Sequence, residues 1–297
     1  QFIMKGGKTL WLVDGTNAEM ENLYNETGST LVGNNDLNLT DMFFKYGFRI
    51  NPQLIKDERG TPLKLASGNQ GSETQMENYN WMMAPYIYPA SKHPIVKNMD
   101  GVKFEFCSPI ELLKSDVKKT ILLESSRYSK IIGTPSVVSL EMIGEETSER
   151  DYINGGFIPV AALLEGSFTS MYNNRVLPFK DDKFLNKSIP TKMIVISDGD
   201  VIKNQLDKGE PIELGYDKYT ATYFGNKEFI LNCVYYLLDD TGLINIRSKD
   251  VTLPLLDKQS VHDNYSQTQM LTVALPIVLL GIFGFLFTYL RKKKYNR

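Results

Sequence analysis

The feature that most constrains this chain is a run of 21 residues without a charge, from Met270 to Leu290. An α-helix rises about 1.5 Å per residue, so the run reaches about 31 Å, the thickness of a bilayer's hydrocarbon core. The alternative is a buried helix of a soluble core, but such helices seldom extend this far without a polar face. The run therefore predicts one C-terminal transmembrane helix over residues 270–290, with the lipid bilayer as a partner.

Four cations follow the apolar run directly: Arg291, Lys292, Lys293 and Lys294. The segment before it mixes acidic and basic residues. Because Lys and Arg beside a span accumulate on its cytoplasmic side, these four residues form a basic cytoplasmic anchor. If the host is a bacterium, the expected location is the inner (cytoplasmic) membrane, with the main domain in the periplasm and the C-terminus in the cytoplasm. The expected organisation is an extracytoplasmic domain (1–249), a juxtamembrane stem (250–269), the transmembrane helix (270–290) and the tail (291–297).

Small residues recur along one stripe of the predicted span, at Ala274, Gly281, Gly284 and Thr288. Small side chains let a second helix approach closely, so the stripe predicts packing against a membrane partner. The alternative is that a lone anchor carries small residues by chance. Pro276 is expected to add a kink to the same helix.

The remaining residues have the composition of a globular protein, because 42% of the chain is hydrophobic and 23% is charged. Short apolar runs predict strands at Thr9–Val13, Phe157–Leu164 and Met193–Ser197, and a 3.6-residue apolar stripe predicts a helix at Asn226–Leu238. Continuous apolar runs are typical of interior strands of parallel sheets. The predicted fold class is α/β, with an open, mostly parallel sheet and flanking helices.

The first residues, Gln1–Gly7, resemble the end of a helix with a glycine stop that leads directly into a strand. No initiator Met or signal peptide precedes them. We therefore expect the first domain to be truncated at its N-terminus.

Charge and motif content exclude several function classes. Five of the cations lie in the last seven residues, so the rest of the chain carries about −7 and has no basic patch for nucleic acid. The sequence has no G-x-G-x-x-G motif after a strand and no P-loop, so we expect no nucleotide cofactor and indeed no cofactor of any kind. Any energy for transport must come from another chain.

Two acidic residues, Asp198 and Asp200, follow the predicted strand Met193–Ser197 directly. Ligand sites of open α/β sheets lie at the carboxyl ends of strands, and two carboxylates are candidate ligands for Mg²⁺ or Ca²⁺. Asp-Gly after a strand is also a common turn, which is the more frequent meaning. The metal interpretation gives the alternative function, a membrane-tethered metal-dependent hydrolase.

Four aromatic residues cluster at Tyr79, Trp81, Tyr86 and Tyr88. They are candidates to line a groove for sugar or peptide, although alternating aromatics more often pack across strands. The identity of any small-molecule ligand stays unknown at this level. His93 and His262 lie in a predicted loop and in the stem, and neither is a catalytic candidate.

Segments spread along the chain resemble the bacterial gliding-motility ABC transporter auxiliary subunit, its substrate-binding G component. The residues that carry the likeness are FIMKGGKTLWLVD (Phe2–Asp14), KYGFRINPQLIKD (Lys45–Asp57), VAALLEGSFTS (Val160–Ser170), MIVISDGDVIKNQ (Met193–Gln205) and GNKEFILNCVYYLLDDTGLINIRSK (Gly225–Lys249).

The resemblance implies a non-enzymatic, membrane-anchored accessory subunit that works with a separate ATPase and a multi-span ABC permease. It also implies a link to surface gliding in Bacteroidetes-type bacteria, and it supplies no catalytic residues. A solute receptor that captures a small ligand is a third possibility beside the accessory subunit and the hydrolase.

Overall fold

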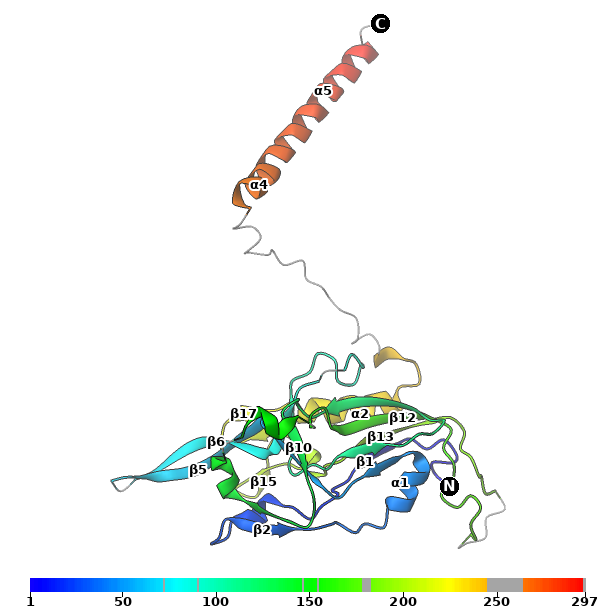
Figure 1. The fold of residues 1–297 in the computed structure, drawn as a ribbon. Coiled ribbons are helices and arrows are strands. Elements are labelled where there is room, and N and C mark those ends of the chain that lie inside the picture. The colour runs from blue at the N-terminus through cyan, green and yellow to red at the C-terminus, as the bar shows by residue number, and fades with distance from the viewer. Residues whose placement is uncertain are drawn as a thin grey trace. The chain divides into compact units, whose positions relative to one another are not determined.

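The computed structural model describes residues 1–71, 73–89, 91–145, 147–153, 155–177, 183–244 and 264–295. The chain divides into two compact units, Gln1–Lys249 and Asp250–Arg297 (Figure 1). The first unit is a mixed α/β structure in which strands predominate, and the second is helical where it is described.

A four-stranded sheet forms the centre of the first unit. Its strand order is β1 (Thr9–Leu12), β13 (Thr191–Ile196), β12 (Pro159–Gly166) and β9 (Lys118–Glu124). The β1 strand runs parallel to β13, whereas β12 runs antiparallel to both β13 and β9. The expectation of a mostly parallel sheet is therefore corrected, because among the described strands only the β1–β13 pair is parallel.

Burial on both faces of this sheet explains the misleading apolar runs. Ile194 and Ile196 on β13 belong to one hydrophobic cluster, while Met193 and Val195 belong to another on the opposite face. Successive side chains of a strand alternate between its two faces. A strand that is buried on both faces therefore has a continuous apolar sequence, whether its neighbours run parallel or antiparallel to it. The apolar pattern indicates that both faces of the strand are buried, and it carries no information about strand direction.

One helix packs in each of these two clusters (Figure 1). The helix predicted at Asn226–Leu238 is confirmed at both ends as α2, which buries Phe229, Cys233 and Leu237 with β12 and β13. The α1 helix (Thr40–Tyr46) places Phe43 and Tyr46 in the other cluster. It ends at Gly47, whose φ of +96° favours glycine.

Short strand pairs surround the central sheet. They are β3 (Phe48–Ile50) with β8 (Ile110–Leu112), β4 (Leu54–Asp57) with β10 (Ser129–Ile132), β2 (Ser29–Val32) with β11 (Ser136–Ser139), β14 (Leu206–Asp207) with β15 (Glu210–Pro211), and β16 (Tyr216–Asp217) with β17 (Thr222–Tyr223). Short 3₁₀ helices lie at Met20–Leu23 (η1), Leu140–Gly144 (η2), Glu149–Tyr152 (η3) and Asp200–Ile202 (η4).

A long β-hairpin projects from the first unit (Figure 1). Its strands are β5 (Gly60–Gln70) and β6 (Glu73–Ile87), and β7 (Val102–Lys103) pairs with the base of β6. No strand is predicted from the sequence between Gly60 and Asn80, because the first part of β6 is exposed and shows no apolar alternation. The base of the hairpin is buried, with Trp81 and Met83 in a third hydrophobic cluster.

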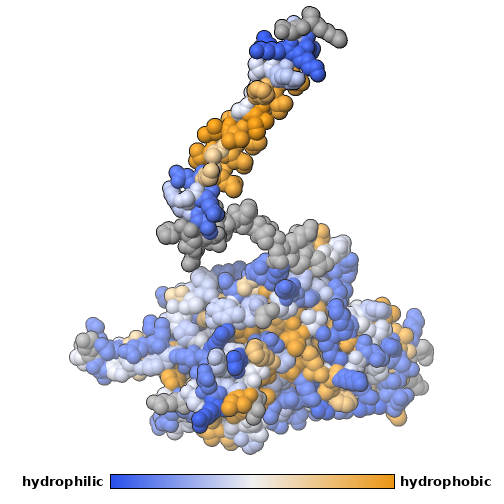
Figure 2. All heavy atoms as spheres, turned by 45° about the horizontal axis from the view of Figure 1, so that its top comes forward, coloured by the Kyte–Doolittle hydropathy of each residue, from blue (hydrophilic) through white to orange (hydrophobic). Residues whose placement is uncertain are grey.

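The second unit contains a continuous helical stretch of 31 residues, Tyr265–Tyr295. Its parts are α4 (Tyr265–Gln269), a π-helical turn (Met270–Ala274) and α5 (Leu275–Tyr295). Pro276 has no backbone N–H for the carbonyl four residues earlier, which accounts for the widened turn. Among the described residues this is the one helix long and apolar enough to cross a membrane, and an 18-residue window within it has a mean hydropathy of 2.5. Figure 2 shows its apolar side chains between two polar ends.

The predicted span 270–290 lies within this helix, and the cations Arg291–Lys294 continue its last turns. The predicted stem is described only from residue 264 onward, and residues 245–263 and 296–297 lie outside the described residues. The membrane crossing itself and its direction stay predictions.

Replacing Phe229 by alanine should lower the free energy of unfolding by about 3–5 kcal/mol, because a fully buried aromatic side chain leaves a cavity between α2 and the sheet. The matched control is Leu238→Ala on the same helix, where the side chain is 69% exposed, and we expect a change within about 0.5 kcal/mol. Denaturant unfolding of the full chain in micelles measures both. Equal losses in the two variants would contradict the packing of α2 described above.

Candidate ligand-binding site

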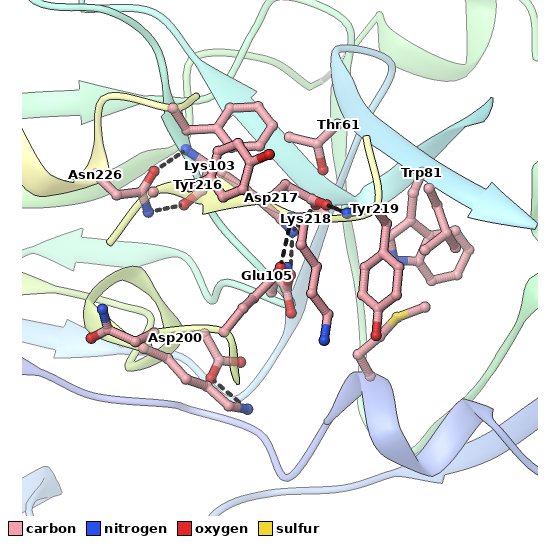
Figure 3. Close-up of a pocket in the computed structure, with 18 of the residues that line it drawn as sticks. Thr61, Trp81, Lys103, Glu105, Asp200, Tyr216, Asp217, Lys218, Tyr219 and Asn226 are labelled. Atoms are coloured by element: carbon pink, nitrogen blue, oxygen red, sulfur yellow. Dashed lines mark hydrogen bonds and ion pairs between the residues drawn. The ribbon is translucent and has the colours of Figure 1, made fainter. Parts of the chain in front are cut away.

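A cavity of about 400 Å³ opens beside the carboxyl end of β13 (Figure 3). Its walls come from η1, the base of the β5–β6 hairpin, β7 and the segment after it, the segment after β13, and β16 with the turn that follows it. We name it the Lys103 cavity, and its charged or aromatic lining residues are Glu21, Tyr24, Trp81, Lys103, Glu105, Asp200, Lys203, Tyr216, Asp217, Lys218, Tyr219 and Phe224.

Lys103 is held between two carboxylates in the wall of this cavity. Its Nζ lies 2.6 Å from Glu105 Oε1 and 3.5 Å from Asp217 Oδ2. Burial acts to lower the pKa of Lys103, but the two carboxylates outweigh burial and the pKa is raised. Lys103 therefore stays charged and fully paired at neutral pH.

The first residue of α2 fixes the backbone of Lys103. Asn226 Oδ1 accepts a hydrogen bond from the Lys103 N–H (2.9 Å), and Asn226 Nδ2 donates to the Lys103 carbonyl (2.8 Å) and to the Val201 carbonyl (3.2 Å). Asn226 is buried, so all three bonds are made away from solvent. The α2 helix thus connects the cavity wall to the main hydrophobic core.

Asp198 is buried below the loop after β13 and does not line the cavity. Its carboxylate accepts backbone hydrogen bonds from Glu105 (2.6 Å) and Asp200 (2.7 Å). Burial and then the charge of Asp200 raise its pKa well above the ordinary value. The contacts of Asp198 are those of a group that holds two chain segments together.

Asp200 does line the cavity, where its Oδ1 pairs with Lys203 Nζ at 3.1 Å. Burial and then the charge of Glu105 raise the pKa of Asp200 to about 6, against the opposing effect of Lys203. Within the part of the chain that the structure describes, no group of three or more His, Cys, Asp and Glu side chains is arranged to hold a metal ion. The hydrolase alternative gains no support from this arrangement.

Aromatic rings occupy much of the lining. Tyr219 is 58% exposed, and Lys218 Nζ lies 5.0 Å from its ring centre. Of the four aromatics singled out in the sequence, only Trp81 lines the cavity. The Tyr86 ring packs against Tyr88 (4.7 Å between centres), and the Tyr79 hydroxyl donates to Glu77 on the exposed hairpin.

Trp81 is only 3% exposed, yet its Nε1 has no hydrogen-bond partner. Its ring meets Phe106 edge-on at 6.3 Å between centres. In Figure 3 the indole nitrogen lies on the side of the ring that faces Tyr219. A buried donor without an acceptor is costly, so an acceptor placed in the cavity would relieve that cost.

A second cavity of about 490 Å³ lies near the end of β1 and is lined by Asp14, Asn35 and Arg49 among others. Asp14 Oδ1 accepts the Gly199 N–H at 2.7 Å, which ties the ends of the parallel strands β1 and β13 together. Arg49 pairs with Glu111 at 3.6 Å and lies over the Phe44 ring. This cavity lacks the convergent charges of the first.

His93 and Cys233 line neither cavity. His93 packs edge-on against Tyr236, and burial lowers its pKa, while His262 falls outside the described residues. Cys233 is a buried free thiol, as its place in the apolar stripe of α2 predicts.

The stripe Ala274, Gly281, Gly284 and Thr288 lies on the second unit, where the Thr288 hydroxyl donates to the Gly284 carbonyl. Its role in helix packing stays a prediction.

Asp200 could be found in the sequence because it follows a predicted strand, where ligand sites of α/β sheets commonly lie. Lys103, Glu105 and Asp217 are not predicted as site residues. A weak signal exists for the first two, because Lys103 and Glu105 flank the fully buried Phe104 and therefore point to the same side. Asp217 comes from a distant segment, and no local pattern indicates that it meets Lys103.

Comparison with known proteins gives one family and one curated relative. Residues 1–233 match the model of a family described as "ABC-type uncharacterized transport system". An "Uncharacterized protein" of Borreliella burgdorferi is 24% identical over 266 residues, which is 87% of this chain and 46% of that protein. The chain thus spans about half the length of this relative. No solved structure matches the chain.

The raised pKa of Asp200 predicts a specific pH dependence of stability. Its pKa rises from 3.8 to about 6 on folding, so the folded state binds this proton more tightly than the unfolded state. The resulting stabilisation is fully present below pH 3.8 and is lost as the pH rises through about 6. Relative to wild type, the Asp200→Asn variant should therefore lack this loss of stability between about pH 4 and 6 in denaturant unfolding. A wild-type-to-variant difference that is independent of pH would contradict the assignment.

Proposed function

The chain belongs to the ABC-type uncharacterized transport system family, and from this premise we propose that it is a membrane-anchored accessory subunit of an ABC transport complex. The family match over residues 1–233 is the observation that carries the proposal. It supports an accessory role in transport, with a permease and an ATPase as the general partners. We propose that the subunit is not itself an enzyme and that the separate ATPase supplies the energy.

The helix Tyr265–Tyr295 supports membrane anchoring, because it is long and apolar enough to cross a bilayer. The cations Arg291–Lys294 at its C-terminal end support a cytoplasmic C-terminus. In this orientation the first unit lies in the periplasm of a bacterium, and the small-residue stripe faces a helix of the permease.

The Lys103 cavity supports a substrate-binding role within the complex. It is concave, lined by aromatic rings and provided with convergent polar groups, which is the usual character of a small-molecule site. The unpartnered Trp81 Nε1 in its wall is an independent sign of an absent acceptor. We propose that the cavity receives the transported or sensed molecule.

The likeness to gliding-motility auxiliary subunits supports a link between this complex and surface gliding in Bacteroidetes-type bacteria. Its segments, such as Met193–Gln205 and Gly225–Lys249, include most of the β13 strand and the whole α2 helix.

Deleting the coding sequence should then abolish spreading on agar while leaving growth in liquid medium unchanged.

Affinity capture of the full-length tagged protein from its native membrane tests the transport role. We expect a permease and an ATPase to be recovered in fixed ratio, because an accessory subunit must contact the machinery it serves. An unrelated tagged single-span protein from the same membrane is the control. Recovery of the chain alone, under conditions that preserve other membrane complexes, would contradict the proposal.

Enlarging the small-residue stripe should weaken that assembly. Gly281→Leu with Gly284→Leu prevents close approach of a second helix, and we expect several-fold less permease in the captured material. The matched control is Leu279→Phe with Leu286→Phe, which enlarges the opposite helical face by the 3.6-residue period. Both variants are quantified in the membrane before capture. Equal permease recovery from the two would show that the stripe is not the contact.

A further inference from the structure

We propose that the Lys103 cavity binds a neutral saccharide, an inference that rests on the proposed substrate-binding role of this subunit. Three properties of the cavity lead to this ligand class: the pairing of its charges, the unpartnered donor of Trp81, and the exposed aromatic faces at its mouth.

The charges of the cavity disfavour an anion. Four carboxylates and three ammonium groups line it. Lys103 is paired with two carboxylates, and Lys203 lies within 4 Å of three, on Asp200, Glu19 and Glu21. The Lys218 ammonium donates to the Leu206 carbonyl at 2.5 Å. A phosphate or carboxylate ligand would therefore meet cations that are already engaged and an excess of negative charge.

The donor inventory disfavours a purely cationic ligand. Trp81 Nε1 is a buried N–H without a partner, and an ammonium ion has no lone pair to offer it. A hydroxyl accepts from the indole N–H and at the same time donates to a carboxylate such as Glu105 or Asp217. Sugar hydroxyls combine both functions at closely spaced positions, which matches the unpartnered N–H of Trp81 and the carboxylate acceptors in this wall.

The aromatic rings supply the remaining requirement. Tyr219 has an exposed ring at the cavity, and Phe224 and Tyr216 lie in the same lining. A pyranose ring presents an apolar face of C–H groups that packs on an aromatic face, while its hydroxyls point to the rim. The volume of about 400 Å³ lies at the lower end of the usual range for ligand pockets, about 300–1,000 Å³, and suits a short saccharide.

A peptide is the closest competing ligand. Extended peptides commonly bind by adding a strand to a free sheet edge. Of the strands in this wall, β16 is two residues long and is already paired with β17, so it offers too short an edge. The β5 strand lies at the edge of its sheet, but it reaches the cavity only with Thr61, Pro62 and Leu63, and Pro62 has no N–H to pair with a peptide. We therefore treat peptide binding as an outcome that would overturn the proposal.

The two tryptophans of the chain make a direct test possible. Trp11→Phe leaves Trp81 as the sole indole of the chain. Trp11 does not line the cavity, and its Nε1 donates to the Thr9 hydroxyl. The full chain carrying Trp11→Phe is placed in lipid nanodiscs, since sugar-headed detergents would compete, and is titrated with maltotriose, cellotriose and chitotriose. We expect at least one to change the Trp81 emission saturably, and inorganic phosphate, spermidine and trialanine to leave it unchanged.

Two substitutions connect such binding to the cavity. Tyr219→Ala removes an exposed ring without disturbing the core, and we expect at least about tenfold weaker binding by calorimetry. The matched control is Tyr235→Ala on α2, where the ring is 55% exposed against 58% for Tyr219, with unchanged affinity. Trp81→Phe should also cost about tenfold, because it removes the donor while keeping an aromatic ring.

The ligand assignment, its location in the cavity and the transport role can each be overturned by a different result. Absence of binding by all three trisaccharides overturns the ligand assignment, as does binding of phosphate, spermidine or trialanine in their place. Saccharide binding that Tyr219→Ala and Tyr235→Ala affect equally overturns the location. If the permease and ATPase are still captured in any of these cases, the transport role stands. If the chain is captured alone while saccharide binding is intact, the transport role fails and the ligand assignment stands.

Discussion

The geometry of the cavity depends on a carboxylate that does not line it. Asp198 accepts the backbone N–H groups of Glu105 and Asp200, two residues 95 positions apart that both contribute acidic side chains to the Lys103 cavity. Burying a carboxylate is costly, and its raised pKa reflects that cost, but two short N–H bonds offset part of it. The Asp14–Gly199 bond extends the same network to β1. Removing the Asp198 carboxylate would leave the N–H groups of Glu105 and Asp200 without this acceptor. Both acidic residues of the cavity would then lose the contact that fixes their backbone.

The position of Lys103 is fixed by a different polar group, Asn226. Asn226 begins α2, the helix whose apolar stripe packs on the central sheet, and its amide clamps both backbone groups of Lys103. The cation is therefore positioned by the hydrophobic core through one amide, while its carboxylate partners come from the same segment (Glu105) and from a distant one (Asp217). Because each charged wall is held by buried hydrogen bonds, the cavity is largely formed before any ligand enters, which lowers the ordering cost of binding.

Patterns confined to one element could be predicted from the sequence, and relations between elements could not. The α2 helix is predicted to both ends because one apolar stripe with a 3.6-residue period encodes it. Strand direction is missed because β13 is covered on both faces, which gives the same apolar run in a parallel or antiparallel sheet. The outer part of the β5–β6 hairpin is missed because the first half of β6 is exposed and shows no apolar alternation. Asp200 could be found from its place after a strand, whereas Asp217 meets Lys103 only through the tertiary fold.

The ion pairs of the cavity's lysines also affect which ligands the cavity can select in a chain that is anchored to a membrane. If the helix anchors the chain, the first unit experiences a high local concentration of lipid headgroups, many of them anionic, and even weak affinity for them would be amplified by the tether. A cavity with free lysines would be filled by such groups. In the Lys103 cavity, Lys103 and Lys203 are each surrounded by more than one carboxylate, so headgroup anions find net repulsion there. The cations Arg291–Lys294 lie instead at the C-terminal end of the predicted span, where attraction to anionic lipid would strengthen anchoring. The pairing of Lys103 and Lys203 with carboxylates thus supports the proposed preference of the cavity for a ligand without net charge.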